Sequence, residues 1–349
     1  MRRTFTSLVV ACGVAALLTA APARTLDLYF IDVEGGQATL VVSPTGESLL
    51  IDTGFPGQGG TFSSTPGDPA QSRDANRILA AAHAAGVTHI DVLLITHFHA
   101  DHDGGVTELS TLLPIRTFVD HNRPLPSVES VKGSLAAFDW YDAVRATGHH
   151  LVVAPGDRLP LTTIDSVVVS SAGDTIRQPL PRARAQNSGC GTEPVPPGEP
   201  NENPRSTGVL LTYGGFRFLD VGDLTGRPLF TLACPRNLIG PVDVYLVAHH
   251  GGADAADPGT FAAFRPRVAV INNGEQKGGA KDLLAMVRAL PAVDSWQLHR
   301  SAAGENTADA RIANLDETTS YWIKISARED GSFTVTNGRT GESRAYPGR

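Results

Sequence analysis

The chain has 349 residues, of which 41% are hydrophobic and 19% are charged, so it is long enough to bury a large core. Its formal net charge is −7 at pH 7, whereas proteins that grip long nucleic acids usually carry a basic face. The basic cluster in the sequence lies in a Pro-rich stretch and comprises Arg177, Arg182, Arg184 and Arg205. Nucleic acid is therefore a possible partner that the net charge does not support.

The first 23 residues have the pattern of a signal peptide. Arg2 and Arg3 precede an apolar stretch, Leu8–Ala20, that is too short to span a bilayer comfortably, and small residues follow at 21–23. The pattern predicts a periplasmic or secreted protein, exported by the general or the twin-arginine route or lipidated at Cys12. No later stretch has the length and apolar character of a transmembrane helix, so no integral membrane segment is expected.

Residues 24–349 are expected to form one domain with an irregular insert at about 120–205. Without the signal peptide, Cys190 and Cys234 are the remaining cysteines, and an even pair in an exported protein predicts a disulfide. Two unpaired thiols, or one Cys acting as a metal ligand, are the alternatives.

The patterns along the mature chain predict strands first and then alternating strands and helices, twice over. In the first half, strands are expected at Leu26–Val33, Ala38–Val42, Glu47–Asp52 and Asp91–Ile95, with a helix capped by Ser72 and running to about Ala85. A helix near Val131–Thr147 and strands at Val152-Val153 and Ser166–Ser170 follow. The second half predicts a hairpin of Val209–Tyr213 and Phe216–Val221, strands at Val242–Val247, Val268–Ile271 and Ser295–Leu298, helices at Pro258–Phe264 and Lys281–Leu290, and a terminal hairpin of Tyr321–Ser326 and Ser332–Thr336. This order indicates an α/β protein with two sheets packed face to face and helices outside.

Four metal-ligand side chains follow the buried strand that ends at Ile95. His97, His99, Asp101 and His102 lie within six residues, and zinc prefers imidazole nitrogen and carboxylate oxygen. In an extended loop, His97 and His99 point the same way, while Asp101 and His102 turn towards a neighbouring position. One short loop is therefore expected to serve two metal ions.

Further candidates follow later strands. Asp223 ends the second strand of the predicted hairpin, where its carboxylate can bridge two metals. His249 and His250 end another apolar strand, and the residues alone do not tell which of them faces the metals. Asp52 is expected to orient a ligand His or to form a turn, and these two roles are compatible.

These motifs identify the chain as similar to a known superfamily. His97-Phe98-His99-Ala100-Asp101-His102 matches the HxHxDH signature of the metallo-β-lactamase superfamily, Asp52-Thr53-Gly54 its early strand-end motif, and Gly222-Asp223 its bridging aspartate. More narrowly, residues 26–300 resemble the hydrolase domain of ComEC-type DNA-uptake proteins, through Phe30-Ile31-Asp32-Val33, Asn203–Asp223 and His249-His250-Gly251-Gly252. The resemblance implies an αβ/βα four-layer sandwich that holds one or two zinc ions, with manganese possible.

The chain departs from this family pattern in the second half of the site. The ComEC-type proteins usually carry Gly-His-Pro after the paired histidines, and their His can serve the second metal, but Gly278-Gly279-Ala280 stands here. His249, His250 or His299 are the candidates to replace it, and a single metal is the alternative. The third-motif His that classical members place between Asp101 and Asp223 has no clear counterpart either. Beyond His102, only His121, His149 and His150 lie there, and the last two are expected on a surface turn.

The predicted function is metal-dependent hydrolysis of the phosphodiesterase type, in which a metal-bound hydroxide attacks a small-molecule or phosphodiester substrate. The metal ligands are predicted to be His97, His99, Asp101, His102, Asp223 and His249. Asp101, Asp223 and His250 are assigned catalytic roles in accepting a proton, stabilising an oxyanion or protonating the leaving group. Hydrolysis of an ester, lactone or β-lactam, or a periplasmic binding protein without turnover, are the alternatives. Arg182 and Arg184, in the Pro-rich loop 179–204, are expected to bind an anionic substrate.

Overall fold

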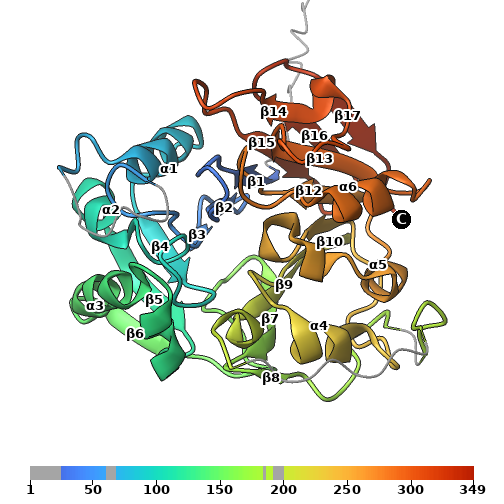
Figure 1. The fold of residues 1–349 in the computed structure, drawn as a ribbon, viewed down its shortest axis with the longest axis horizontal. Helices are drawn as coiled ribbons and strands as arrows, with labels where there is room; N and C mark the ends of the chain where they lie inside the picture. The colour runs from blue at the N-terminus through green and yellow to red at the C-terminus, as the bar shows by residue number, and fades with distance from the viewer. Residues whose placement is uncertain (1–24, 60–67, 184–185, 192–199) are drawn as a thin grey trace, which may run out of the picture.

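Two β-sheets form the middle of the protein in the computed structural model, which describes residues 25–59, 68–183, 186–191 and 200–349 (Figure 1). The first sheet has nine strands in the order β17 (Ser343–Tyr346), β16 (Phe333–Asn337), β15 (Ile323–Ala327), β1 (Leu26–Phe30), β2 (Thr39–Val42), β3 (Ser48–Ile51), β4 (Ile90–Leu94), β5 (Ile115–Asp120) and β6 (His149–Val152). Its strands are antiparallel from β17 to β3 and parallel from β3 to β6. The predicted signal peptide at 1–23 lies outside the described residues.

The second sheet repeats this plan. Its eight strands lie in the order β14 (Ile312–Asn314), β13 (Asp294–His299), β12 (Val268–Ile271), β11 (Val244–Leu246), β10 (Phe216–Asp220), β9 (Gly208–Tyr213), β7 (Asp165–Ser171) and β8 (Asp174–Thr175). Strands β10 to β14 are parallel, whereas β7, β8, β9 and β10 pair antiparallel. Each half of the chain thus supplies one sheet with a parallel and an antiparallel part, except that β15–β17 from the C-terminal end join the first sheet.

Alternation along the strands divides the buried side chains into layers. In β1, Leu28 points into the core between the two sheets, and its neighbour Tyr29 faces the helices on the other side. The core between the sheets also contains Phe218 and Trp296, both essentially without solvent exposure. Successive side chains of a strand point to opposite faces, so a strand covered on both faces is mostly apolar, as β4 is apart from the half-buried Asp91.

Helices cover the outer face of each sheet (Figure 1). The first sheet is covered by α1 (Arg73–Ala84), α2 (Val106–Leu112) and α3 (Ser134–Arg145), and the second by α4 (Gly226–Ala233), α5 (Pro258–Phe264) and α6 (Lys281–Arg288). Short 3₁₀ turns complete the described elements: η1 (Pro126–Ser130), η2 (Asn203–Arg205), η3 (His249–Gly251), η4 (Ala253–Ala255) and η5 (Asp309–Arg311). The layers run helix, sheet, sheet, helix, which confirms the predicted αβ/βα sandwich. None of the helices in the described part of the chain has the length and apolar content needed to span a bilayer.

Most predicted elements are present within a few residues of their expected bounds, and α5 and β12 match fully. The surface turn predicted for His149 and His150 is wrong, because both belong to the edge strand β6, which pairs with β5. His150 Nε2 there contacts the buried carboxylate of Asp120 at 3.0 Å. The disulfide between Cys190 and Cys234 is present, which confirms that prediction.

Candidate metal centre

The candidate ligands meet because they follow parallel strands at the same edge of the sandwich. Asp52 follows β3, and the run from Thr96 to His102 follows the adjacent strand β4. Asp223 lies three residues beyond β10, and His249 lies three beyond its parallel neighbour β11. Because the carboxyl ends of neighbouring parallel strands share one edge of a sheet, each sheet presents its polar residues there, and the packing of the two sheets brings both groups together.

A close contact between the two sheets holds this edge together. Gly222 has a φ of +56°, and a Cβ atom on it would lie 2.8 Å from the Thr96 side chain. Nearby, the Thr207 amide donates to the Thr96 carbonyl at 2.7 Å, and the His249 amide donates to the Gly222 carbonyl at 3.1 Å. Only glycine fits the left-handed backbone and the missing space at position 222, so Asp223 reaches the HxHxDH loop.

Four of the predicted residues form a compact, buried group. One ligand atom from each of Asp101, His102, Asp223 and His250 lies within 4.8 Å of the others. The Nε2 atoms of both histidines lie 3.2 Å from Asp223 Oδ2. From Asp101 Oδ2 they lie 3.3 Å and 3.2 Å away. Two imidazoles and two carboxylates form a donor set typical of zinc, iron or manganese.

A second pair of imidazoles adjoins this group. His97 Nε2 lies 3.0 Å from His99 Nδ1 and 3.9 Å from Asp223 Oδ2. The Thr96 hydroxyl lies 3.2 Å from the other ring nitrogen of His97, which leaves Nε2 facing the site. Asp223 is thus a neighbour of both sets of histidines, as its predicted bridging role requires.

Residues outside the ligand set fix the orientation of the imidazoles. His102 Nδ1 lies 2.7 Å from Asp52 Oδ2, and the Thr96 hydroxyl donates to the same carboxylate oxygen at 2.7 Å. A histidine that donates its Nδ1–H to a carboxylate presents the Nε2 lone pair to a metal. The position of Asp52 agrees with its predicted role in orienting a ligand His.

His249 and His250 occupy different positions in the site. His250 is 1% exposed and contributes Nε2 to the compact group. The His249 side chain is 28% exposed, with Nε2 at 3.8 Å from Asp223 Oδ2 and Nδ1 at 2.8 Å from Asp254. His299 lies elsewhere and contacts Asp32 at 2.8 Å. The described structure therefore places His250 in the compact group, His249 at its exposed margin and His299 outside it.

The other histidines between His102 and Asp223 do not join this group. His121 is buried and lies 3.2 Å from Glu202, while His149 and His150 belong to β6. The adjoining Asn203 does reach the site, because its Nδ2 lies 3.2 Å from His249 Nε2. Asn203 is a site residue that the sequence did not lead us to expect, since asparagine in a Pro-rich loop has many ordinary uses.

Three of the residues at this edge have a left-handed backbone although they carry side chains. The φ angles are +61° for Asp52, +51° for His249 and +53° for His250. This conformation costs about 1–3 kcal/mol for each such residue and is concentrated at functional sites, where surrounding contacts enforce it. The conformation supports a functional role for the paired histidines.

Lys277 is a further residue at the site that was not predicted. Its ammonium group forms an ion pair with Asp101 Oδ2 and lies 5.3 Å from the centre of the Phe55 ring. Lys277 belongs to the loop between β12 and α6, in the segment 274–282 where the family resemblance led us to expect a histidine. A lysine has no lone pair while protonated, so it acts here as a positive charge and not as a metal ligand.

The buried atoms of this group fit a metal ion. Asp223 Oδ1 and His99 Nε2 are buried and have no hydrogen-bond partner among the described residues. Burying carboxylates such as Asp101 and Asp223 without compensating positive charge is costly, and a divalent cation supplies that charge. The donor set and these unsatisfied atoms are what a metal site contains, so His97, His99, Asp101, His102, Asp223 and His250 would hold one or two ions.

The electrostatics of two ligands, His97 and Asp223, agree with this interpretation. Burial, together with the neighbouring imidazoles of His102 and His99, holds the pKa of His97 well below its usual value, so its ring is neutral and available to a metal. Burial opposes ionisation of Asp223, but the neighbouring histidines outweigh it and hold the pKa of this carboxyl well below its usual value. Metal ligands must be unprotonated, and both groups meet that condition at neutral pH. At His102, burial lowers the pKa, but the charges of Asp223, Asp101 and Asp52 outweigh it and hold the pKa well above its usual value, so a metal ion there would have to displace a proton.

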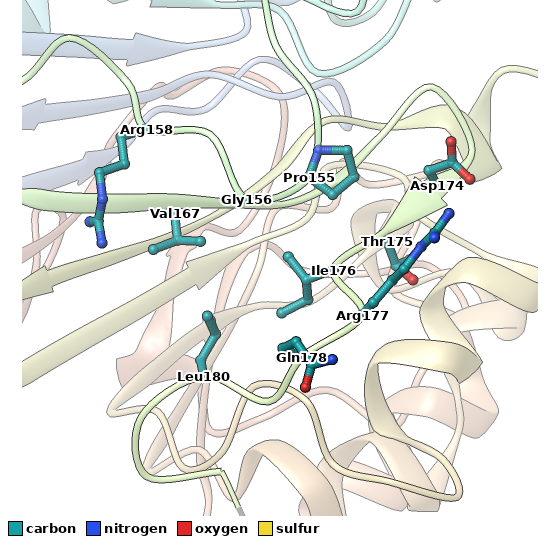
Figure 2. A pocket seen from close by; sticks show the side chains of 10 residues that line it. All are labelled: Pro155, Gly156, Arg158, Val167, Asp174, Thr175, Ile176, Arg177, Gln178 and Leu180. Atoms are coloured by element: carbon teal, nitrogen blue, oxygen red, sulfur yellow. The ribbon is translucent and has the colours of Figure 1, made fainter.

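Two cavities differ in whether a residue next to this centre lines them. A cavity of about 440 Å³ between α4, α5 and the disulfide is lined in part by Asp254, the partner of His249. A cavity of about 500 Å³ lies beside β7 and β8 (Figure 2). Figure 2 shows Arg158 at one side of it and Asp174 and Arg177 at the other, with Val167, Ile176 and Leu180 between them. No predicted site residue lines the second cavity.

The expectation that Arg182 binds an anionic substrate at the active centre is wrong. Arg182 Nη1 donates to the carbonyl of Gly215, in the turn that precedes β10. Asp223 follows the opposite end of β10, so the arginine lies at the far end of the strand. Arg184 lies outside the described residues.

Comparison with family models agrees with the fold. Residues 31–271 match the model of the metallo-beta-lactamase superfamily, which is more than half of the chain. The chain belongs to the metallo-β-lactamase superfamily. Its members are mostly metal-dependent hydrolases, although hydroxylases share the fold. Comparison with curated proteins gave no significant match.

Several solved structures of this superfamily fold resemble the chain at low sequence identity. A metal-dependent hydrolase of the β-lactamase superfamily, Tm1679, is 15% identical with a TM-score of 0.47, over 79% of this chain and 97% of its own. A metallo-β-lactamase from Cronobacter sakazakii, a mutant in its HARLDQ motif, is 13% identical with a TM-score of 0.39, over 68% of this chain and 88% of its own. The E377D mutant of the β-hydroxylase CmlA is 16% identical with a TM-score of 0.44, over 80% of this chain. This chain spans about half, 53%, of the CmlA chain.

Proposed function

We propose that this member of the metallo-β-lactamase superfamily is an exported, metal-dependent hydrolase that cleaves phosphodiesters. The observation that carries the proposal is the buried group of Asp101, His102, Asp223 and His250, with His97 and His99 beside it. When bound, a metal ion in such a site lowers the pKa of water and polarises a phosphoryl oxygen. Zinc is the metal we favour and manganese the alternative, because both accept imidazole and carboxylate ligands.

The residues of this chain divide between holding the metal and meeting the substrate. His250 is buried within the compact group, so we now assign it to the ligands rather than to proton transfer. His249 is 28% exposed and is oriented by Asp254, so we assign it the protonation of the leaving group. This exchanges the roles that the sequence alone led us to expect for the two histidines.

The closer relationship to ComEC-type hydrolase domains is part of the same proposal and favours a phosphodiester substrate. Asn203, within the segment Asn203–Asp223 that carries the resemblance, supports this relationship because it contacts His249. Export rests on the sequence pattern of residues 1–23. Ester, lactone or β-lactam hydrolysis uses the same kind of centre and is the second candidate.

The deciding experiment measures metal content by elemental mass spectrometry on the purified mature chain, beside turnover of bis-p-nitrophenyl phosphate and nitrocefin with and without chelator. We expect one or two ions per chain and diester cleavage that the chelator abolishes. His99→Ala and Asp223→Ala should lower this activity by at least about 100-fold, because loss of even an outer-shell partner costs 10–100-fold. His89→Ala is the matched control, since His89 pairs with Asp91 at the other end of β4.

Three other results would each reject the proposal. Nitrocefin turnover without diester turnover would favour the β-lactam alternative. Fewer than one ion per chain and no turnover of either substrate would favour a binding protein on the same fold. Diester cleavage unchanged in both variants would place the reaction at another site.

A further inference from the structure

One cationic side chain stands at the metal group without being able to serve as a ligand. Among the lysines and arginines of the described residues, Lys277 is the one that forms an ion pair with a member of the compact group. Its partner is Asp101 Oδ2. The lysine side chain is 36% exposed, so its ammonium group lies at the boundary between the buried carboxylate and solvent. Lys277 therefore faces the space beside the ligands that a substrate must enter.

The backbone holds Lys277 firmly in this position. The Gly274 amide donates to the Lys277 carbonyl at 2.8 Å, and the Gly279 amide donates to the His250 carbonyl at 2.8 Å. Gly35, with a φ of +84°, approaches so closely that a Cβ atom there would lie 2.9 Å from Lys277 Cβ. The loop is thus fixed between the paired histidines and the turn after β1, and only the flexible stem of Lys277 remains to adjust.

The chemistry of lysine indicates what this position recognises. An ammonium group is a compact positive charge with three N–H donors, and it is a common partner of phosphate. Asp101 accepts one of these donors, which leaves the others for an acceptor on the solvent side. A neutral ester would gain little from this charge, whereas an anionic phosphoryl or carboxylate oxygen would gain a charge-assisted hydrogen bond.

We propose that Lys277 is the substrate-specificity residue of this centre and that it binds the anionic phosphoryl group of the substrate beside the metal ligands. The inference rests on the proposed hydrolase function and names the residue that would recognise the negative charge of its substrate. It also replaces Arg182, which lies at the other end of β10, as the source of positive charge for the substrate.

Inorganic phosphate is the probe that tests this proposal without turnover. Isothermal titration calorimetry measures the Kd of phosphate for the metal-loaded protein. This Kd should be between about 10-fold and 100-fold higher for Lys277→Met than for the wild type. Lys277→Arg keeps the charge and should recover most of the affinity. Lys281→Met is the matched control, because Lys281 is exposed at the start of α6 and loses the same charge a few residues away.

Turnover provides the second test. In Lys277→Met, the KM for anionic bis-p-nitrophenyl phosphate should rise by a similar factor, while the KM for neutral p-nitrophenyl acetate stays unchanged. If the protein cleaves no diester, the proposed function fails, but phosphate titration still decides the role of Lys277. Metal content and the circular dichroism spectrum of the variant should equal those of the unmodified protein.

Several outcomes would overturn the proposal. One is a wild-type protein that binds no phosphate at millimolar concentration. Another is a phosphate Kd for Lys277→Met within twofold of the Kd for Lys281→Met. A third is a KM that rises equally for the neutral and the anionic substrate in Lys277→Met. Loss of metal in Lys277→Met would assign the residue a structural role at Asp101 instead.

Discussion

At the scale of single residues, the centre depends on side chains that hold the ligands as well as on the ligands. Asp52 is fully buried, and burial raises its pKa, against the opposing effects of His102 and Thr96. Burying a carboxylate loses the free energy of its solvation. The contact of Asp52 with His102 helps to offset this loss. The contact fixes the tautomer of His102 that leaves Nε2 for a metal, and Asp52 also accepts hydrogen bonds from the Thr96 amide and hydroxyl.

Asp52→Ala should therefore weaken metal binding between about 10-fold and 100-fold, as loss of a carboxylate behind a ligand histidine does elsewhere. Competition with a chromophoric chelator measures this affinity directly. Asp91→Ala is the control, because Asp91 lies at the opposite end of β4 and contacts His89 and Arg116. An unchanged metal affinity in Asp52→Ala would show that Thr96 alone orients His102.

At the scale of elements, covalent and packing restraints hold the loops around the centre. The disulfide joins Cys190, in the Pro-rich stretch, to Cys234, at the end of α4. Asn187 adds to this restraint, since its Nδ2 donates to the carbonyl of Gly259 in α5 at 2.7 Å. These contacts border the cavity that Asp254 also lines, so the loop is tied to the helices beside His249.

Reduction of the disulfide, or the double change Cys190→Ser and Cys234→Ser, should lower the free energy of unfolding by about 4 kcal/mol. The estimate follows from the loop-closure entropy of a cross-link that spans 44 residues. Chemical unfolding with and without reductant measures the effect, and reductant should not change the midpoint of the double variant. If reductant did not change the denaturant midpoint of the wild-type protein, the expected stabilisation by the disulfide would be contradicted.

At the scale of the whole molecule, a buried ionic cluster joins the two sheets. His299, at the end of β13, contacts Asp32 and Glu34, in the turn after β1, and Arg77 of α1 pairs with both carboxylates. Burial would lower the pKa of His299, but its hydrogen bond to Asp32 and the charges of Asp32 and Glu34 outweigh this effect and raise the pKa above 6.5. The cluster thus links the N-terminal turn to the C-terminal half of the chain.

This raised pKa makes stability depend on pH in a defined direction. Because folded His299 holds its proton more tightly than the unfolded chain does, its contribution is fully present below the unfolded pKa of about 6.5 and is lost as pH rises through the folded pKa. The difference in melting temperature between the wild type and His299→Gln should therefore shrink from pH of about 6 towards alkaline pH. A difference that is constant or grows with pH would contradict the protonated pair.

Local patterns in the sequence determined the element types and most ligand candidates. The period of two in β1 and the apolar run Val92–Leu94 in β4 follow from which faces are buried, so both can be recognised without a structure. The HxHxDH run can also be recognised from the sequence, because its ligands lie within one loop and their chemistry is specific to metals.

The tertiary structure alone decided which distant residues join that loop. The ion pair of Lys277 with Asp101 spans 176 positions, and the contact of Asn203 with His249 spans 46. The choice between His249 and His250 depends on two consecutive left-handed residues, which no local pattern predicts. These contacts arise from the packing of two sheets at one edge, and packing brings together residues whose separation in sequence carries no periodic signal.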